Sequence, residues 1–149
     1  AIKKAFEEDT EVIIERFVKG IEVSVGVYEV SNGIHVLPIT EIQTENEFFD
    51  YQAKYEDGHS REITPAELPE KITAVCKDTT AKIYRHLNCF GICRVDFIIS
   101  QNGDMNFLEI NTNPGMSKAS IVPKQIRAEG LDEAKVFSAI IKRALSAKR

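Results

Sequence analysis

The sequence predicts a single α+β domain over residues 1–149, a mostly antiparallel β-sheet covered by helices in a two-layer arrangement. Residues 22–30 alternate valines with polar residues, which is the period of a strand buried on one side. The turn signals Ser31-Asn32-Gly33 and Asn102-Gly103 each separate two strand-like segments, as in a β-hairpin. Three other stretches repeat apolar residues at helical spacing and would cover the sheet.

The first third of the chain is rich in strand patterns, predicted over residues 12–18, 22–30 and 34–42. The first two strands are joined at Lys19-Gly20. Pro38 has no backbone N–H, so the third strand should lie at a sheet edge or contain a bulge there. Residues 48–65 are mostly polar and have little periodicity, which predicts that most of this stretch is a loop, of the length that functional lids often have.

Helices and a second hairpin follow. The predicted elements are a helix over 67–87, strands over 93–100 and 106–111, and helices over 121–128 and 131–145. The apolar stripe of the first helix comprises Leu68, Ile72, Val75, Cys76, Ala81, Ile83 and Leu87. Gly130 would end the helix predicted over 121–128. Asp132 and Glu133 favour the N-terminus of the last helix, predicted over 131–145.

The composition excludes several classes of protein. The chain is 43% hydrophobic and 28% charged, which fits a soluble globular domain with its own core. The net charge of −4 argues against a nucleic-acid partner. Neither a membrane span nor a signal peptide is expected. The three cysteines lie in hydrophobic surroundings without zinc-type spacing, so reduced thiols of an intracellular protein are expected.

The hairpin around Asn102-Gly103 brings polar side chains onto one face. A two-residue turn centred on this dipeptide sets the register of both strands. The facing pairs on the polar face are then Asp96 with Glu109 and Arg94 with Asn111. The residues that fill the opposite, apolar face are Val95, Phe97, Leu108 and Ile110.

The polar face has the composition of a hard-metal site. Two opposed acids destabilise a sheet unless they are solvated, protonated or bridged by a cation. With the amide oxygen of Asn111, Asp96 and Glu109 form a set that suits Mg²⁺ or Mn²⁺. Arg94 would supply a fixed positive charge for a phosphoryl group. The alternative is a solvated sheet face with a diagonal Arg94–Glu109 salt bridge. The loop that follows, NTNPGMSKAS, is rich in backbone N–H groups and favours the site.

These residues resemble the C-terminal part of ATP-grasp enzymes, and most closely the D-alanine–D-alanine ligases. The stretches that carry the resemblance are VIIERFVKGIEVSV, FFDYQAKY, EITPAEL, GICRVDFI and LEINTNPGMSKAS. The resemblance implies that ATP phosphorylates the carboxylate of one D-alanine and that the amine of a second attacks the acylphosphate. A tetrahedral intermediate then yields the dipeptide and phosphate. The resemblance further implies that this reaction is a step of peptidoglycan precursor synthesis in the bacterial cytoplasm.

By resemblance, the polar face and the loop after it hold the reacting groups. Asp96, Glu109 and Asn111 would bind two Mg²⁺ or Mn²⁺ ions that bridge the β- and γ-phosphates of ATP. Arg94 and the backbone N–H of Gly115 would stabilise the tetrahedral oxyanion. Ser120 would bind the carboxylate of the second D-alanine. Lys118 departs from the family pattern, because small or neutral residues are more usual at this position.

The resemblance also implies a nucleotide site. The implied contacts are Glu15 with the adenine amino group, the main chain of Phe17 and Val18 with the base edge, and Glu22 with the ribose. Phe48 and Leu108 would sandwich the purine, Lys54 would meet the phosphates, and the lid residue Tyr55 would close over the second substrate. Without the resemblance, the two glutamates would be ordinary surface acids and the apolar residues ordinary core.

The family further implies segments that these residues do not include. The chain begins at Ala1, and AIKKAFEED resembles the end of a helix already under way. A longer enzyme is therefore expected, with a glycine-rich phosphate loop and an N-terminal domain for the first D-alanine. This longer enzyme could form a homodimer. The present residues alone should bind nucleotide weakly and not turn over.

Three other functions fit part of the pattern. Another ATP-grasp ligase, for D-lactate, D-serine or a different amino acid, would share the metal and adenine residues and differ around Tyr55 and residues 117–120. A non-catalytic metal-binding α+β module that dimerises through its sheet would bind Mg²⁺ without regard to nucleotide. A paired-carboxylate glycosidase ranks low, because no aromatic residue accompanies Asp96 and Glu109 as a sugar platform.

Overall fold

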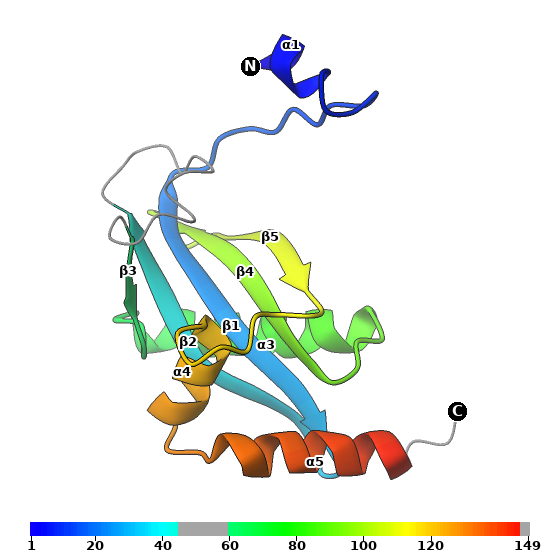
Figure 1. The fold of residues 1–149 in the computed structure, drawn as a ribbon. Coiled ribbons are helices and arrows are strands. Elements are labelled where there is room, and N and C mark those ends of the chain that lie inside the picture. The colour runs from blue at the N-terminus through cyan, green and yellow to red at the C-terminus, as the bar shows by residue number, and fades with distance from the viewer. Residues whose placement is uncertain (45–59, 147–149) are drawn as a thin grey trace.

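The computed structural model describes residues 1–44 and 60–146. These residues form a five-stranded sheet in the order β3-β2-β1-β4-β5 (Figure 1). The strands are β1 (Gly20–Val30), β2 (Gly33–Thr44), β3 (Ser60–Ile63), β4 (Ile92–Ser100) and β5 (Met105–Asn111). The helices are α1 (Ile2–Ala5), α3 (Glu70–His86), α4 (Ile121–Ala128) and α5 (Glu133–Ser146). Each pair of neighbouring strands is antiparallel, so the predicted α+β class is confirmed.

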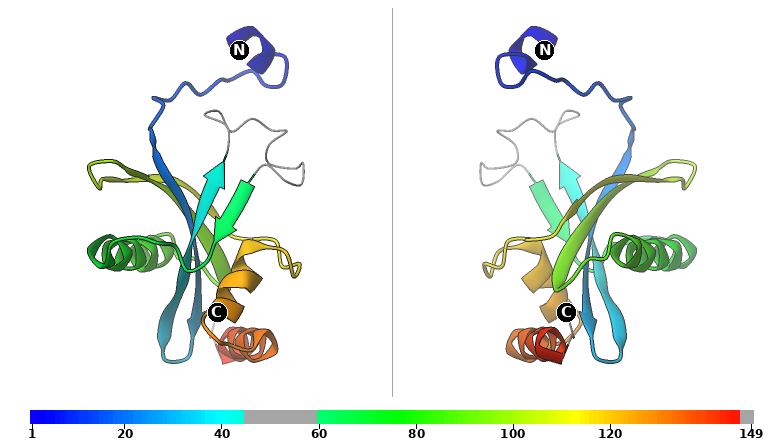
Figure 2. Two further views of the ribbon diagram at one scale, coloured as in Figure 1. Left: turned by 90° about the vertical axis from the view of Figure 1, so that its left-hand side faces the viewer. Right: turned by 90° about the vertical axis from the view of Figure 1, so that its right-hand side faces the viewer.

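Helices lie on both faces of the sheet, as Figure 2 shows, with α3 on one side and α4 and α5 on the other. The core facing α3 joins the odd-numbered valines of β1 to Cys76 and Tyr84. A second core joins Tyr28 and Leu37 to residues of α4 and α5, including Val122 and Ile126. The molecule therefore has three layers where the sequence predicted two. A strand pattern that is apolar on one side does not reveal how many helices its other side receives.

The bulge predicted from Pro38 is present. Val25 of β1 pairs with Ile39, but the next pair is Val27 with Val36, so two residues of β2 face Gly26 alone. Because β2 lies between β1 and β3, the edge alternative does not apply. The missing N–H of proline explains why the ladder is interrupted at this point.

The strand predicted over residues 12–18 is wrong. Residues 11–19 belong to no helix or strand, and they lead from α1 to β1 away from the sheet (Figure 1). Ile13 and Ile14 are 85% and 76% exposed. An apolar run at strand spacing becomes a strand only where a neighbouring strand accepts its backbone hydrogen bonds, and the run itself does not provide that neighbour.

The loop predicted over residues 48–65 contains a strand that the sequence did not reveal. Residues 60–63 form β3, which pairs with β2 from Glu41 to Thr44. Residues 45–59 lie outside the described part of the chain. A four-residue edge strand with two charged residues has too little alternation to be recognised from the sequence.

The buried stripe of α3 differs from the predicted one. Val75 and Leu87 are 48% and 57% exposed, whereas Cys76, Thr80 and Tyr84 are buried at a spacing of one helical turn. The two polar side chains are buried with partners, as such groups must be. The Thr80 hydroxyl donates to the Cys76 carbonyl oxygen (2.8 Å), and the Tyr84 hydroxyl donates to that of Gly91 (2.8 Å).

The last predicted helix is present, but it begins at Glu133, two residues later than predicted. Asp132 precedes α5 and accepts a hydrogen bond from the backbone N–H of Lys135 (2.9 Å), which is a helix N-cap contact. Among the described residues, no helix has both the length and the apolar character needed to cross a membrane.

Candidate functional site

The predicted facing pairs of the second hairpin are confirmed. Asp96 pairs with Glu109, and Arg94 pairs with Asn111. Side chains alternate along a strand, so these four lie on the face of the sheet that receives α4, opposite Val95 and its neighbours. Two acids therefore face one another across β4 and β5, as the site requires.

The turn that produces this register is different from the predicted one. Ser100 and Asp104 close a three-residue loop, in which the backbone N–H of Ser100 donates to the Asp104 carbonyl oxygen (2.9 Å). Gly103 has φ +86°, a value that glycine adopts readily. A bulge between Asp96 and Phe97 compensates for the longer loop, because Phe97 pairs with Phe107 and leaves Leu108 over. The prediction that Leu108 packs in the apolar core is wrong, because Leu108 is 45% exposed.

Asp96 is 4% exposed and lies in a dense network of hydrogen bonds. Arg94 donates to both carboxylate oxygens, from Nε to Oδ1 (3.0 Å) and from Nη2 to Oδ2 (2.8 Å). The Ser24 hydroxyl of β1 donates to Oδ1 (2.7 Å). Such charge-assisted hydrogen bonds fix the orientation of the carboxylate. With a further contact from Arg94 Nε to Oδ2 (3.1 Å), they engage both oxygens of the carboxylate.

Arg94 lies between the two acids. Its Nη2 is 3.7 Å from Oε1 of Glu109, so the diagonal salt bridge considered as an alternative is also present. Burial lowers the pKa of Arg94. The hydrogen bond and charge of Asp96, with the charges of Glu109 and Glu22, outweigh that effect and raise this pKa above its ordinary value. Arg94 is thus a permanent cation in a site where three acidic groups surround one positive charge.

The donor set fits a hard divalent cation. The side chain of Glu109 is 58% exposed and faces the buried Asp96, so the pair joins one accessible carboxylate to one enclosed carboxylate. Asn111 presents an amide oxygen that accepts from the backbone N–H of Asn113 (2.9 Å) and retains a second lone pair. Within residues 1–44 and 60–146, no three His, Cys, Asp or Glu side chains cluster as metal ligands. A cation held here would need a third donor of another kind, such as the amide of Asn111 or an atom of a bound substrate.

The loop between β5 and α4 brings Gly115 and Ser120 together. A Cβ atom placed on Gly115 would lie 3.0 Å from the Ser120 hydroxyl oxygen, so a larger residue would displace that hydroxyl. The hydroxyls of Ser117 and Ser120 are hydrogen-bonded to each other (2.9 Å). Ser120 is the N-cap residue of α4. Lys118 is exposed, and its carbonyl oxygen accepts from Arg127 Nη2 (2.6 Å).

Apart from Leu108, which lies on β5, the predicted nucleotide residues divide into three groups. Glu22 is half-buried on β1, two residues before Ser24 and on the same face. Glu15 and Phe17 are exposed and Val18 is half-buried in the irregular segment before β1. The predicted residues Phe48, Lys54 and Tyr55 lie outside the described part of the chain.

Ser24 is a site residue that the sequence prediction missed. It occupies the position in β1 that faces Asp96, in phase with Glu22, and the same alternation would have indicated it. A serine among buried valines needs a partner, and Asp96 is that partner.

Ser24→Ala should lower the free energy of unfolding by about 2 kcal/mol, because a buried carboxylate loses a hydrogen bond. Equilibrium urea unfolding of the chain measures this change. Ser138→Ala, at an exposed position of α5, is the matched control and should change little. Equal effects of the two substitutions would show that the Ser24–Asp96 hydrogen bond does not contribute to stability.

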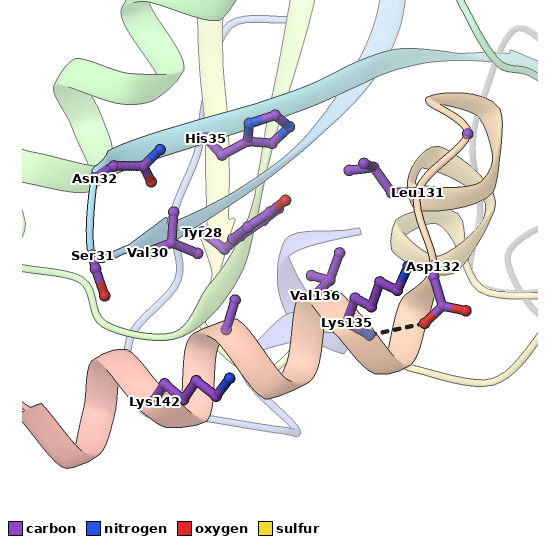
Figure 3. Close-up of a pocket in the computed structure, with 12 residues that line it drawn as sticks. Tyr28, Val30, Ser31, Asn32, His35, Leu131, Asp132, Lys135, Val136 and Lys142 are labelled. Carbon is purple, nitrogen blue, oxygen red and sulfur yellow. Dashed lines mark hydrogen bonds between the residues drawn. The ribbon is translucent and has the colours of Figure 1, made fainter.

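A cavity of about 630 Å³ lies apart from this site, between the β1–β2 hairpin and α5 (Figure 3). The rings of Tyr28 and His35 on its wall are 5.0 Å apart, and His35 Nε2 lies 2.8 Å from Oε2 of Glu129. Burial and the charge of Glu129 raise the pKa of Tyr28. None of the residues that line this cavity belongs to the predicted site.

Comparison with known proteins identifies the family. The model of the family described as "D-ala D-ala ligase C-terminus" matches residues 1–142. The chain belongs to this family. A D-alanine–D-alanine ligase from Phocaeicola vulgatus is 51% identical over 141 residues, which are 95% of this chain and 43% of that protein. The family predicted from the sequence is therefore confirmed.

Solved structures of this family share the fold. The D-alanine–D-alanine ligase from Bacillus anthracis complexed with ATP is 35% identical, with a TM-score of 0.77 over 97% of this chain and 46% of that chain. The VanG D-Ala:D-Ser ligase from Enterococcus faecalis is 30% identical, with a TM-score of 0.79 over 95% of this chain and 41% of that chain. The present chain thus spans less than half the length of each of these relatives.

Proposed function

We propose that this chain is the C-terminal catalytic portion of an ATP-dependent D-alanine–D-alanine ligase. The observation that carries the proposal is the Asp96–Glu109 pair, held on one sheet face with Arg94 between the two acids. Opposed acids cost stability, so their presence in a family of ligases is best explained by a bound cation and phosphates. The remaining segments of the complete enzyme would supply the glycine-rich loop and the first D-alanine site.

The residues of the site divide the chemistry among them. Asp96, Glu109 and Asn111 would hold Mg²⁺ or Mn²⁺, which supplies charge neutralisation for phosphoryl transfer to the first D-alanine. Arg94, fixed by Asp96, would neutralise the oxyanion that forms when the second amine attacks the acylphosphate. The backbone N–H of Gly115 would assist it, and the Ser120 hydroxyl would bind the carboxylate of the second D-alanine.

The nucleotide contacts remain proposals of the same kind. Glu15 and the main chain of Phe17 and Val18 would bind adenine, which requires residues 11–19 to lie against the body of the complete enzyme. Glu22 would accept from the ribose hydroxyls, on the same face as Asp96. The other proposed contacts are Phe48, Leu108, Lys54 and Tyr55. The enzyme would act in the bacterial cytoplasm, where peptidoglycan precursors are made. The complete enzyme would be a homodimer, which a measurement of its mass in solution tests.

Phosphate release by the complete protein tests the reaction. With ATP and Mg²⁺ present, D-alanine alone should support release of inorganic phosphate and formation of the dipeptide. D-serine and D-lactate, offered with D-alanine, test the acceptor, since the VanG relative is a D-Ala:D-Ser ligase. If the main product were a mixed dipeptide or a depsipeptide, the acceptor would be D-serine or D-lactate instead of D-alanine. The proposed ATP-dependent ligation would still hold. No phosphate release with any acceptor would refute the proposed function.

Metal affinity separates the ligase from a non-catalytic metal-binding module. Calorimetric titration of the complete protein should show that Mg²⁺ binds more tightly when a non-hydrolysable ATP analogue is present, because phosphate oxygens complete the coordination shell. An Mg²⁺ affinity that is the same with and without the analogue would favour the module instead.

A further inference from the structure

Gln125 is a buried polar residue of α4 that the proposed chemistry does not use. Gln125 is 0% exposed, and its side-chain amide contacts the middle strands of the sheet. The Oε1 atom accepts from the backbone N–H of Gly26 (2.9 Å). The Nε2 atom donates to the carbonyl oxygen of Ser24 (2.9 Å) and to the hydroxyl oxygen of Thr40 (3.0 Å). The single side chain therefore ties α4 to both β1 and β2.

The bulge explains why the sheet needs this side chain. The β1–β2 register passes from Val25 to Val27, so Gly26 has no Cα partner in β2. A buried backbone N–H must still be paired, and Gln125 accepts it. The fit is close on both sides, because a Cβ atom on Gly26 would lie 2.6 Å from Gln125 Oε1. Gln125 and the bulge therefore fix the position of α4 on the sheet.

The same contacts connect two parts of the proposed site. Ser24, whose carbonyl oxygen accepts from Gln125, donates its hydroxyl to Asp96. At the other end, α4 begins immediately after its N-cap Ser120, five residues before Gln125. We infer that Gln125 is a positioning residue, which sets the distance between the Ser120 loop and the Asp96 carboxylate. This inference rests on the proposed ligase function.

A second tie of α4 provides a contrast. Lys124 Nζ lies 2.9 Å from Oε2 of Glu62 on the edge strand β3, with side chains 39% and 26% exposed. A partly exposed ion pair contributes little, because water screens it. Lys124→Met therefore removes a contact of the same helix without touching the centre of the sheet, and serves as a matched control. Ile126→Val, in the core beside Gln125, controls for loss of packing.

The test compares Gln125→Met and Gln125→Glu in the complete protein. Gln125→Met keeps the length of the side chain and loses its hydrogen bonds. It should raise KM for the acceptor D-alanine about tenfold or more, because a small displacement of a binding group costs much of its contribution. KM for ATP should change by less than about threefold, since the proposed nucleotide contacts lie on other elements. Lys124→Met and Ile126→Val should leave the acceptor KM near that of the unsubstituted protein.

Gln125→Glu adds a readout that a merely structural residue would not give. A buried carboxyl group has a raised pKa, and in its protonated form it accepts from Gly26 and donates to the Ser24 carbonyl oxygen. The acceptor KM of this variant should therefore be near normal at low pH and rise as the carboxyl ionises. The unsubstituted protein should lack this additional pH dependence. If Gln125→Met does not fold, the pH profile of Gln125→Glu still decides.

Hydrogen exchange of the unsubstituted protein distinguishes the failure of this inference from that of the proposed function. The Gly26 amide should be protected because it donates to Gln125. Protection with normal ligase activity and an acceptor KM that is unchanged in both Gln125 variants would overturn the positioning role alone. Rapid exchange of the Gly26 amide would show that its hydrogen bond to Gln125 does not persist in solution, and would overturn the positioning role. Absence of ligase activity from the unsubstituted protein would overturn the function on which it rests.

Discussion

Glu109→Gln should lower the turnover of the complete protein by roughly 10²-fold or more, because it removes a charged ligand from the proposed metal site. The glutamine keeps the shape of the side chain, so substrates should still enter the site. Steady-state phosphate release at saturating ATP and D-alanine measures the effect. The Mg²⁺ concentration for half-maximal activity should rise in the same variant.

The same substitution should have little effect on folding. Glu109 faces Asp96, and its side chain is 58% exposed, so replacing its charge relieves a repulsion while losing only a 3.7 Å contact with Arg94. The free energy of unfolding should change by less than about 1 kcal/mol. Glu67→Gln, at an exposed position before α3, is the matched control for loss of one negative charge. Unchanged turnover in a folded Glu109→Gln variant would count decisively against the metal site.

Arg94→Ala should lower the rate of the chemical step while leaving ATP binding nearly unchanged. Arg94 is proposed to neutralise the oxyanion, a charge that exists only after the acylphosphate has been attacked. A loss of about 10²-fold in kcat with a KM for ATP within about threefold is the expected pattern. Arg94→Lys keeps the charge without the paired N–H donors and should recover only part of the rate. A rise in KM for ATP alone would make Arg94 a phosphate ligand of the ground state instead.

Arg94→Ala should also destabilise the fold, unlike Glu109→Gln. The carboxylate of Asp96 would stay buried with only the Ser24 hydroxyl as its partner. Leaving a buried charge without its counter-ion costs roughly 2–4 kcal/mol, less than a fully enclosed pair because Arg94 is partly exposed. Kinetic measurements should therefore be made well below the melting temperature of the variant, which thermal unfolding gives directly.

The local features of the site were predictable from the sequence. Alternation along β4 and β5 places Asp96, Glu109, Arg94 and Asn111 on one face, and the observed pairs agree. The length of the turn was not predictable in the same way. A three-residue loop and a bulge at Leu108 changed the register by equal and opposite steps, so the facing pairs at the site were correct although the turn was not.

Segments whose structure depends on a distant neighbour were the ones that sequence patterns described poorly. Residues 12–18 have the composition of a strand and are not one, whereas residues 60–63 have almost no strand pattern and extend the sheet. In both cases the deciding factor is whether another strand lies alongside. The prediction of the buried stripe of α3 was wrong for a related reason. Thr80 and Tyr84 are buried because backbone carbonyl oxygens accept their hydroxyl protons, and the sequence pattern does not show these partners.

The sequence by itself determined the α+β class, the family, and which residues share the acidic face, because side-chain alternation and short motifs are properties of neighbouring residues. Only the tertiary structure decided that Asp96 is buried against Arg94 and Ser24, and that Gln125 holds α4 to the bulge. Ser24 and Asp96 are 72 positions apart, and Gln125 and Ser24 are 101 positions apart. Contacts over such separations arise from the packing of whole elements, which no local pattern specifies.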